Sequence, residues 1–183
     1  MKKPTIINLF GGPGAGKSTS AAFIFAELKM RGVDCELVRE FAKYKTWERN
    51  LKIFDNQTYI FGKQSYKMSI LHGEVDVVIT DSPLMLSVIY ETTSEHLKNH
   101  VMELFNSYNN INYFIERTNP YKINGRHQDE KEAIKLDQKV ISCLELNDIS
   151  FKYINSNREG YKYIVNDVMN SWKVKLNVYI IVW

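Results

Sequence analysis

The stretch Thr5-Ile-Ile-Asn-Leu-Phe10-Gly-Gly-Pro-Gly-Ala-Gly16-Lys17-Ser18 decides the fold of this chain. Its first six residues are β-branched or apolar apart from one asparagine and predict a buried strand. Residues 17–31 have a helical pattern that ends at Gly32. The glycine-rich segment between them fits G-x-x-x-x-G-K-[ST] in full, the phosphate-binding loop (P-loop) pattern, and it stands in the strand–loop–helix context that the pattern requires.

The P-loop predicts how a nucleoside triphosphate and its metal would be held. Its glycines let backbone N–H groups turn toward a phosphate, and the amino end of the following helix adds a favourable dipole. Lys17 would bridge the β- and γ-phosphates, Ser18 would hold Mg²⁺, and Thr19 would contact the α-phosphate. A glycine turn that merely caps a helix explains the glycines but not the Lys17-Ser18 pair. The predicted nucleotide-binding residues are Gly12, Pro13, Gly14, Ala15, Gly16, Lys17, Ser18 and Thr19.

Apolar runs alternate with helical patterns along the rest of the chain. Further strands are expected at residues 35–38, 75–80, 111–116 and 149–154, and further helices at 41–51, around 60–71, at 83–108, 129–146 and 161–172. Parallel strands need long crossovers, so this alternation predicts an α/β fold with a parallel sheet and helices on both faces. Ligands of such sheets bind at the carboxyl ends of the strands.

Composition excludes several classes of protein. The chain has 183 residues, 44% hydrophobic and 25% charged, with a net charge of +3. These values suit a single globular domain in the cytoplasm of a bacterium or an infected host cell, and no apolar run is long enough to cross a membrane. Cys35 and Cys143 are isolated, which excludes a four-cysteine zinc site or a disulfide framework.

Two carboxylates follow predicted strands. Asp81 leaves the apolar run Val77-Val-Ile-Thr80, where a P-loop protein places the carboxylate that orients Mg²⁺. The alternative is that Asp81 or Ser82 caps the next helix. Glu40 follows the second strand and could accept a proton from an acceptor hydroxyl. It could equally be a solvated residue at a helix start.

Two segments concentrate positive charge. Residues 117–126 carry three cations and no carboxylate, and we expect Arg117 and Arg126 to close over the transferring phosphoryl group. A solvated basic loop is the alternative. Residues 39–52 carry five cations against two glutamates, interleaved with aromatic residues. That pattern could hold a nucleobase or a DNA strand, although an ordinary surface helix explains it slightly better.

The remaining motifs narrow the class of P-loop protein. Neither the guanine-binding N-K-x-D nor the switch D-x-x-G of GTPases occurs. Motor ATPases commonly place a catalytic glutamate after the metal-binding aspartate, whereas this chain has Ser82. A small-molecule or nucleotide kinase remains.

Four segments carry a resemblance to a known group: the P-loop, Arg39-Glu-Phe-Ala-Lys43, Ile79-Thr-Asp-Ser-Pro83, and the loop from Arg117 to Arg126 followed by Glu130 to Asp137. Together they resemble the P-loop kinases often encoded by phages, similar to the ribosylnicotinamide kinase domain of NadR and to deoxynucleoside and nucleoside-monophosphate kinases. The resemblance spans most of residues 4–160. It implies a five-stranded sheet of order 2-3-1-4-5, Mg·ATP as phosphate donor, and Asp81 or Glu40 near the acceptor. Some phage relatives phosphorylate 5-hydroxymethyluracil within DNA. The D-R-S of deoxynucleoside kinases is absent here.

We therefore predict a kinase that transfers the γ-phosphate of ATP to a hydroxyl of a nucleoside, nucleotide or modified-base acceptor. Lys17, Asp81, Glu40, Arg117 and Arg126 form the predicted catalytic set, with Ser18 and Asp81 on the metal. Residues 1–173 would form the kinase domain with a lid loop at about 117–128, and residues 174–183 a tail. Gln57, Tyr59 and Gln64 would lie on the helix beside the acceptor pocket. A kinase acting on DNA would need a basic groove, which Arg39, Lys43, Lys45 and Arg49 could form. A regulatory ATPase would have no acceptor, and the oligomeric state is left open.

Overall fold

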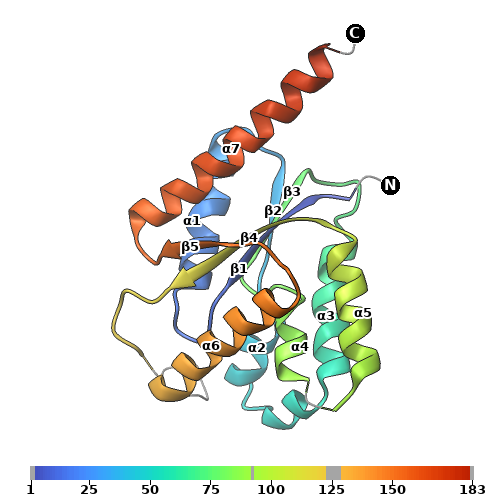
Figure 1. The fold of residues 1–183 in the computed structure, drawn as a ribbon, viewed down its shortest axis with the longest axis vertical. Helices are drawn as coiled ribbons and strands as arrows, with labels where there is room; N and C mark the ends of the chain where they lie inside the picture. Colours follow the sequence, from blue (N-terminus) through green and yellow to red (C-terminus); the bar gives the residue numbers. More distant parts are fainter. Residues whose placement is uncertain (1–2, 92, 123–128, 182–183) are drawn as a thin grey trace.

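The computed structural model describes residues 3–91, 93–122 and 129–181 and has one central sheet (Figure 1). Its strands are β1 (Thr5–Phe10), β2 (Cys35–Val38), β3 (Val77–Thr80), β4 (Asn109–Glu116) and β5 (Lys152–Asn155). They are all parallel and lie in the order β2-β3-β1-β4-β5. This confirms the predicted fold class, including the strand order.

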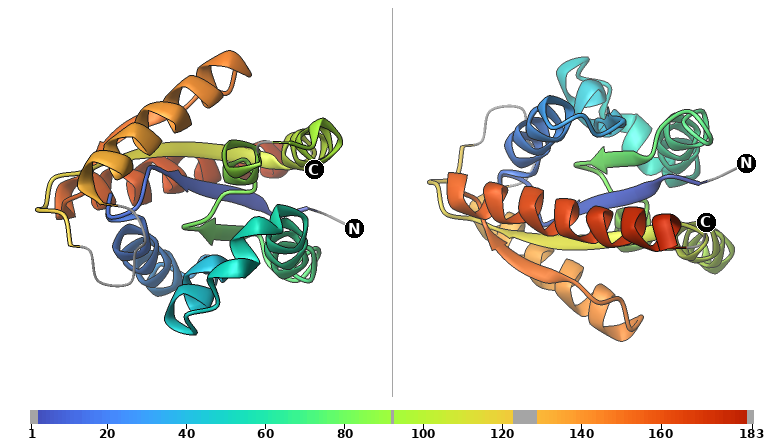
Figure 2. Two further views of the ribbon diagram at one scale, coloured as in Figure 1. Left: turned by 90° about the horizontal axis from the view of Figure 1, so that it is seen from below. Right: turned by 90° about the horizontal axis from the view of Figure 1, so that it is seen from above.

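Helices cover both faces of the sheet (Figure 2). They are α1 (Lys17–Met30), α2 (Phe41–Trp47), α3 (Gln57–Ser69), α4 (Leu86–Tyr90), α5 (Glu95–Asn106), α6 (Glu130–Leu146) and α7 (Arg158–Ile181), with a 3₁₀ helix η1 (Leu51–Asp55). Successive residues of β1 point to opposite faces, because side chains alternate along a strand. Ile7 and Leu9 belong to one core, with α1 and α7, and Ile6 and Phe10 to the other.

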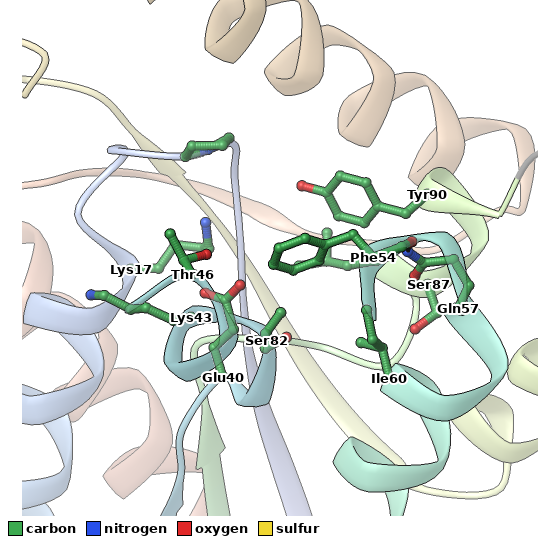
Figure 3. A pocket seen from close by; sticks show the side chains of 13 residues that line it. Lys17, Glu40, Lys43, Thr46, Phe54, Gln57, Ile60, Ser82, Ser87 and Tyr90 are labelled. Carbon is green, nitrogen blue, oxygen red and sulfur yellow. Dashed lines mark hydrogen bonds between the residues drawn. The ribbon is translucent and has the colours of Figure 1, made fainter. Parts of the chain in front are cut away.

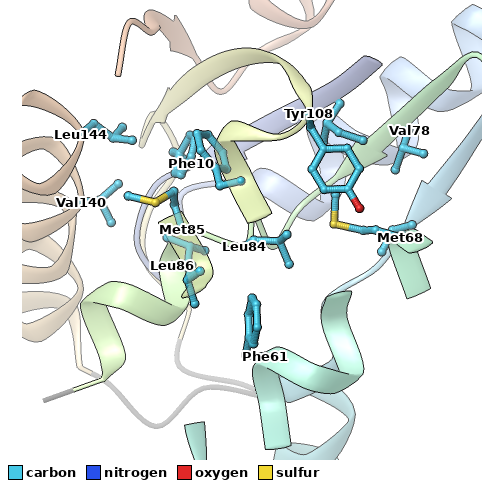
Figure 4. Close-up of a cluster of buried hydrophobic side chains, with 14 of the residues drawn as sticks. Phe10, Phe61, Met68, Val78, Leu84, Met85, Leu86, Tyr108, Val140 and Leu144 are labelled. Carbon is cyan, nitrogen blue, oxygen red and sulfur yellow. The ribbon is translucent and has the colours of Figure 1, made fainter. Parts of the chain in front are cut away.

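The second core fixes the helices that border the carboxyl ends of the strands (Figure 4). Phe10 at the end of β1 packs in one cluster with Phe61 and Met68 of α3 and with Leu84 and Met85 before α4. All five side chains are at most 4% exposed. Burial of several large apolar side chains, each worth about 1.5–3 kcal/mol, anchors α3 and the segment before α4. Helix α2 has no such anchor, because none of its seven residues is buried.

Several element boundaries differ from the sequence prediction. The helix expected at 83–108 is two helices, because the Glu91 carboxylate accepts the backbone N–H groups of Thr93 and Ser94 (2.7 and 2.9 Å). The Ser94 hydroxyl then caps α5 by accepting the N–H of Leu97 at 3.2 Å. Residues 41–51 divide between α2 and the start of η1, and the third and fifth strands begin two and three residues later than predicted.

The last helix is longer than predicted, beginning at Arg158 and continuing to Ile181 rather than ending at residue 172 (Figure 1). Among the described residues, no helix combines the length and apolar character that crossing a membrane requires. Both cysteines are free thiols, with Cys35 buried and Cys143 partly so.

Candidate active site

The P-loop has the backbone of an anion-binding turn. Gly11, Gly14 and Gly16 all have positive φ angles (133°, 76° and 99°), which side chains of L-residues rarely allow. Gly16 occupies the N-cap of α1, and having no side chain it leaves the first N–H groups of that helix open to a ligand. The first turn of α1 also contains no acidic residue. The amino end of this 14-residue helix is therefore suited to a phosphate.

Lys17 lies folded back over the P-loop. Its Nζ donates to the carbonyl oxygens of Gly11 (2.7 Å) and Gly12 (2.9 Å). Burial lowers the pKa of Lys17, and the nearby carboxylates of Glu40, Asp81 and Asp137 act in the opposite direction. Residues from the ends of β2 and β3 and from α6 thus converge electrostatically on one ammonium group.

Two adjoining cavities meet at this lysine. The smaller, about 140 Å³, is lined by the P-loop residues 13, 14 and 16–19 together with Glu40 and Lys43. The larger, about 390 Å³, extends away from the P-loop between α2, η1, α3 and α4. Pro13, Lys17, Glu40 and Lys43 line both cavities and form their common wall. In Figure 3 the charged side chains lie at one end of the larger cavity, and Phe54 and Tyr90 lie at the other.

Glu40 and Asp81 come together because β2 and β3 are neighbours in the sheet, with Val38 opposite Thr80. The backbone N–H of Glu40 donates to Asp81 Oδ1 at 2.8 Å, and Asp81 is only 3% exposed. Burial raises the pKa of Glu40, as does the charge of Asp81, while Lys17 and Lys43 oppose the shift. The alternative role of Asp81 or Ser82 as a helix cap is wrong, because α4 begins only at Leu86 with Met85 at its N-cap.

The donor atoms fit a magnesium ion. Mg²⁺ takes hard oxygen ligands, usually one or two carboxylates, with water and substrate phosphates completing an octahedron. Ser18 lines the phosphate cavity and Asp81 lies within electrostatic reach of Lys17, so a hydroxyl and a carboxylate are available. No group of three or more His, Cys, Asp or Glu residues in the described ranges could hold a metal by itself. Ser18 and Asp81 would therefore hold Mg²⁺ together with a nucleotide.

Arg117 contacts the P-loop, and its closing over a transferring phosphoryl group stays a prediction. Its guanidinium donates to the carbonyl oxygen of Pro13 (2.6 Å) and to Asp137 Oδ2 (2.7 Å), and it lies over the Tyr121 ring at 5.5 Å. The Arg117 and Asp137 side chains are only 12% and 19% exposed, so the alternative of a solvated loop is wrong for Arg117. Arg126 and the rest of 123–128 lie outside the described residues.

The wall of the larger cavity differs from the sequence prediction. Gln57 lines the cavity, whereas Gln64 is buried outside its lining. The Gln64 amide oxygen accepts the N–H of Phe41 at 3.2 Å, and the amide nitrogen donates to the carbonyl oxygen of Ser82 at 3.3 Å. Tyr59 packs edge-on against Phe41 at 5.7 Å. Sequence reasoning missed several other lining residues: Phe54 on η1, Ile60 on α3, and Leu86, Ser87 and Tyr90 on α4. The packing of η1, α3 and α4 against one another brings these residues to the cavity.

The four cations proposed for a DNA groove divide between different surroundings. Lys43 lines both cavities. Arg39 lies over the Tyr44 ring at 5.6 Å, and Lys45 pairs with Glu48 at 2.6 Å. Of these four residues, only Lys43 lines either of the two cavities described above. Arg39 and Lys45 instead interact with side chains of α2 and its C-cap.

Fold and site together define a P-loop domain whose phosphate-binding loop joins the central strand of a five-stranded parallel sheet to its following helix. The chain belongs to the AAA domain family, whose model matches residues 6–162. A search of curated proteins finds no match.

Two solved structures show the same fold over nearly the whole chain. Thymidylate kinase from Ehrlichia chaffeensis is 15% identical, with a TM-score of 0.60 over 93% of this chain and 99% of that chain. Deoxyadenosine kinase from M. mycoides, solved with dCMP and dCDP, is 19% identical, with a TM-score of 0.52 over 92% of this chain and 99% of that chain. The resemblance to nucleoside and nucleotide kinases is thus confirmed for the fold, and the link to the NadR group stays a prediction.

Proposed function

We propose that the protein is an ATP-dependent kinase that transfers the γ-phosphate to a hydroxyl of a nucleoside or nucleotide-type acceptor. The observation that carries the proposal is the common wall of the two cavities, where Lys17, Glu40 and Lys43 face both. A triphosphate in the small cavity and an acceptor in the large one would meet across these three side chains. A protein that only hydrolyses ATP needs no second cavity of about 390 Å³ at this point.

The phosphate end would act by position and charge. The open N–H groups of α1 would bind phosphate oxygens, and Lys17 would leave its carbonyl partners for the β- and γ-phosphates. A magnesium ion bound with the nucleotide supplies positive charge that offsets the charge of the phosphates. Little covalent chemistry is required of a protein in phosphoryl transfer, so positioning and electrostatic stabilisation supply most of the rate.

Glu40, which lines both cavities, would receive the acceptor proton. The acceptor oxygen forms a bond to the γ-phosphorus, the bond from that phosphorus to the β,γ-bridging oxygen breaks, and ADP leaves. The hydroxyl proton passes to the Glu40 carboxylate, whose raised pKa makes it a better base than an ordinary glutamate. Asp81, held beneath it through the Glu40 N–H, remains on the metal side.

The larger cavity suits a nucleobase ring attached to a sugar that carries hydroxyl groups. Its volume lies in the range of about 300–1,000 Å³ that small-molecule sites occupy. Phe54, Ile60 and Leu86 give apolar surface, whereas Gln57, Ser87 and Tyr90 carry polar groups that could select among rings. The names of the two fold neighbours, a deoxyadenosine kinase and a thymidylate kinase, support this acceptor class.

The test is transfer from γ-labelled ATP to a panel of nucleosides, nucleotides and DNA containing 5-hydroxymethyluracil. Label on a small acceptor, lost in Lys17→Ala and kept in the exposed control Lys139→Ala, is the expected result. Label released only to water would overturn the kinase and favour a regulatory ATPase. Label found only on DNA would replace the small acceptor with a polymer.

A further inference from the structure

Helix α6 contacts the P-loop through one side chain that the proposed mechanism does not use. Asp137 Oδ1 accepts the backbone N–H of Gly12 in a short hydrogen bond, and Asp137 Oδ2 accepts an N–H of Arg117 at 2.7 Å. A second N–H of Arg117 bonds the carbonyl of Pro13 at 2.6 Å. Asp137, Arg117 and the P-loop thus form a closed ring of hydrogen bonds.

This contact is tight at the backbone as well. A Cβ added at Gly12 would lie 2.7 Å from both the Ala133 carbonyl oxygen and Asp137 Oδ1. A Cβ added at Gly14 would lie 2.9 Å from an Arg117 nitrogen. Real Cβ atoms essentially never approach other atoms so closely. Because Gly12 and Gly14 have no Cβ, the side chains of Asp137 and Arg117 can approach the P-loop backbone closely enough to form these hydrogen bonds.

The bonds hold Arg117 beside the phosphate cavity without exhausting its donors. An arginine has five N–H donors, and Pro13 and Asp137 use two of those of Arg117 among the described contacts. Pro13, whose carbonyl oxygen accepts a hydrogen bond from Arg117, lines both cavities. The charges of Arg117 and Asp137 both act on Lys17 at the centre of the site.

We propose that Asp137 is a positioning residue for phosphoryl transfer. It acts through Arg117, fixing the guanidinium against the P-loop before a nucleotide arrives so that its charge is in place for the transferring phosphoryl group. The catalytic part of this inference rests on the proposed kinase activity. The arrangement has a cost that can be measured, because the Asp137 carboxylate also brings a negative charge to a site for a negative ligand.

The test replaces Asp137 by asparagine, which keeps the shape and removes the charge. Arg117 then loses its ion pair, and we expect kcat for transfer to fall by about 10²-fold, the effect of misplacing a group by about 1 Å. ADP should bind as tightly as to the wild type or more tightly, because a negative charge is gone. Glu145→Gln, the same charge change at an exposed position of α6, should alter neither quantity. If ADP affinity, kcat and melting temperature all fell together in Asp137→Asn, Asp137 would have only a structural role, and the proposal would be overturned.

A double-mutant cycle with Arg117→Ala tests the route through Arg117. If the two residues act as one unit, adding Asp137→Asn to Arg117→Ala lowers kcat no further. Full additivity would refute the proposal. Arg117→Lys serves in the same cycle should the alanine variant fold poorly.

Calorimetric binding of ADP and ATP gives a second readout that needs no acceptor. Asp137→Asn and Arg117→Ala should each lower the preference for ATP over ADP by about tenfold, which is the contribution of one charge-assisted hydrogen bond. The double variant should lower that preference no further than either single variant does. If the wild type phosphorylates no acceptor, the proposed function fails, yet these constants still decide whether Asp137 positions Arg117. An unchanged preference in Asp137→Asn would show that it does not.

Discussion

A Cβ at Gly16 would overlap the loop that follows β5, and we expect Gly16→Ala to be among the most damaging single-methyl changes in this protein. The added Cβ would lie 1.9 Å from Ser156 Oγ and 3.1 Å from Ser156 Cβ. Ser156 is only 3% exposed, and its hydroxyl pairs with the Tyr161 hydroxyl at 3.0 Å. The backbone at Gly16 also has φ +99°, which strains any other residue.

The magnitude follows from two contributions. An alanine in this left-handed conformation costs about 1–2 kcal/mol. Displacing the buried Ser156 hydroxyl from Tyr161 leaves polar groups unpaired at a cost of about 1–3 kcal/mol. The free energy of unfolding should therefore fall by about 3.5 kcal/mol, the midpoint of the combined range of about 2–5 kcal/mol, which lowers the melting temperature by about 7–14 °C for a domain of this size.

Two other glycines separate the contributions. Gly32 has φ +78° but nothing within 4 Å of an added Cβ, so Gly32→Ala should show the strain alone, about 1–2 kcal/mol. Gly62 lies inside α3 with open space around it, so Gly62→Ala should stabilise by about 0.5–1 kcal/mol. Urea unfolding of the three variants, with equal slopes against denaturant, provides the comparison.

Adding Ser156→Ala to Gly16→Ala should recover part of the loss by removing the atom 1.9 Å away. Two results would contradict the clash with Ser156. Gly16→Ala could unfold no more easily than Gly32→Ala, or Ser156→Ala could lower the free energy of unfolding equally in the wild type and in Gly16→Ala.

Three further predictions concern titrating groups. Glu40→Gln should lower transfer by about 10²–10⁴-fold, and because the pKa of Glu40 is raised, wild-type activity should rise with pH through a value above that of an ordinary glutamate. A pH–rate profile with its acid limb at or below 4.5 would contradict this role. Desolvation of its hydroxyl in the cavity wall, with the charges of Glu40 and Asp137 contributing, raises the pKa of Tyr90 to about 12 although 41% of the residue is exposed. The hydroxyl therefore stays protonated near neutral pH. Tyr90→Phe, which removes a polar group from the cavity, should raise the KM for the acceptor and leave the pH profile near neutrality unchanged. Although burial acts the other way, hydrogen bonds from Lys152 and Tyr113 lower the pKa of Asp167. The stability that Asp167 contributes is therefore fully present above pH 3.8, the ordinary pKa of aspartate, and is lost as the pH falls through the lower pKa of Asp167 in the folded protein. Acid unfolding of Asp167→Asn should not show this loss.

The sequence predicted the sheet and the phosphate end well because both depend on local pattern. The P-loop motif and the strand before it occupy fourteen consecutive residues, and the glycine conformations follow from that context. The convergence of Glu40 and Asp81 followed from a general rule, since the carboxyl ends of neighbouring parallel strands meet at one edge.

The parts that sequence reasoning missed depend on distant packing. Asp137 ends one of the segments that carry the family resemblance, but its contact with the P-loop was not predicted. It lies 125 residues from the glycine whose N–H it accepts, and nothing in the pattern of α6 points to that contact. Phe54 and Tyr90 line the larger cavity because η1 and α4 pack beside it, a packing that local sequence pattern does not reveal. The break after α4 depends on side-chain hydrogen bonds of Glu91 and Ser94, which helical periodicity does not reveal.

Helix α2, none of whose seven residues is buried, contributes Ala42, Lys43 and Thr46 to the larger cavity. Substitutions on a partly exposed surface usually change stability by no more than about 0.5 kcal/mol, whereas a methyl group added at Gly12 or Gly16 meets other atoms at 2.7 Å or less. The two ends of the site are therefore unequally free to evolve. Mutation can vary the α2 wall of the larger cavity, where the proposed acceptor would bind, at little cost to folding, whereas the P-loop leaves almost no room for added atoms. A lineage with this fold could acquire new acceptors through α2 and keep its phosphate donor.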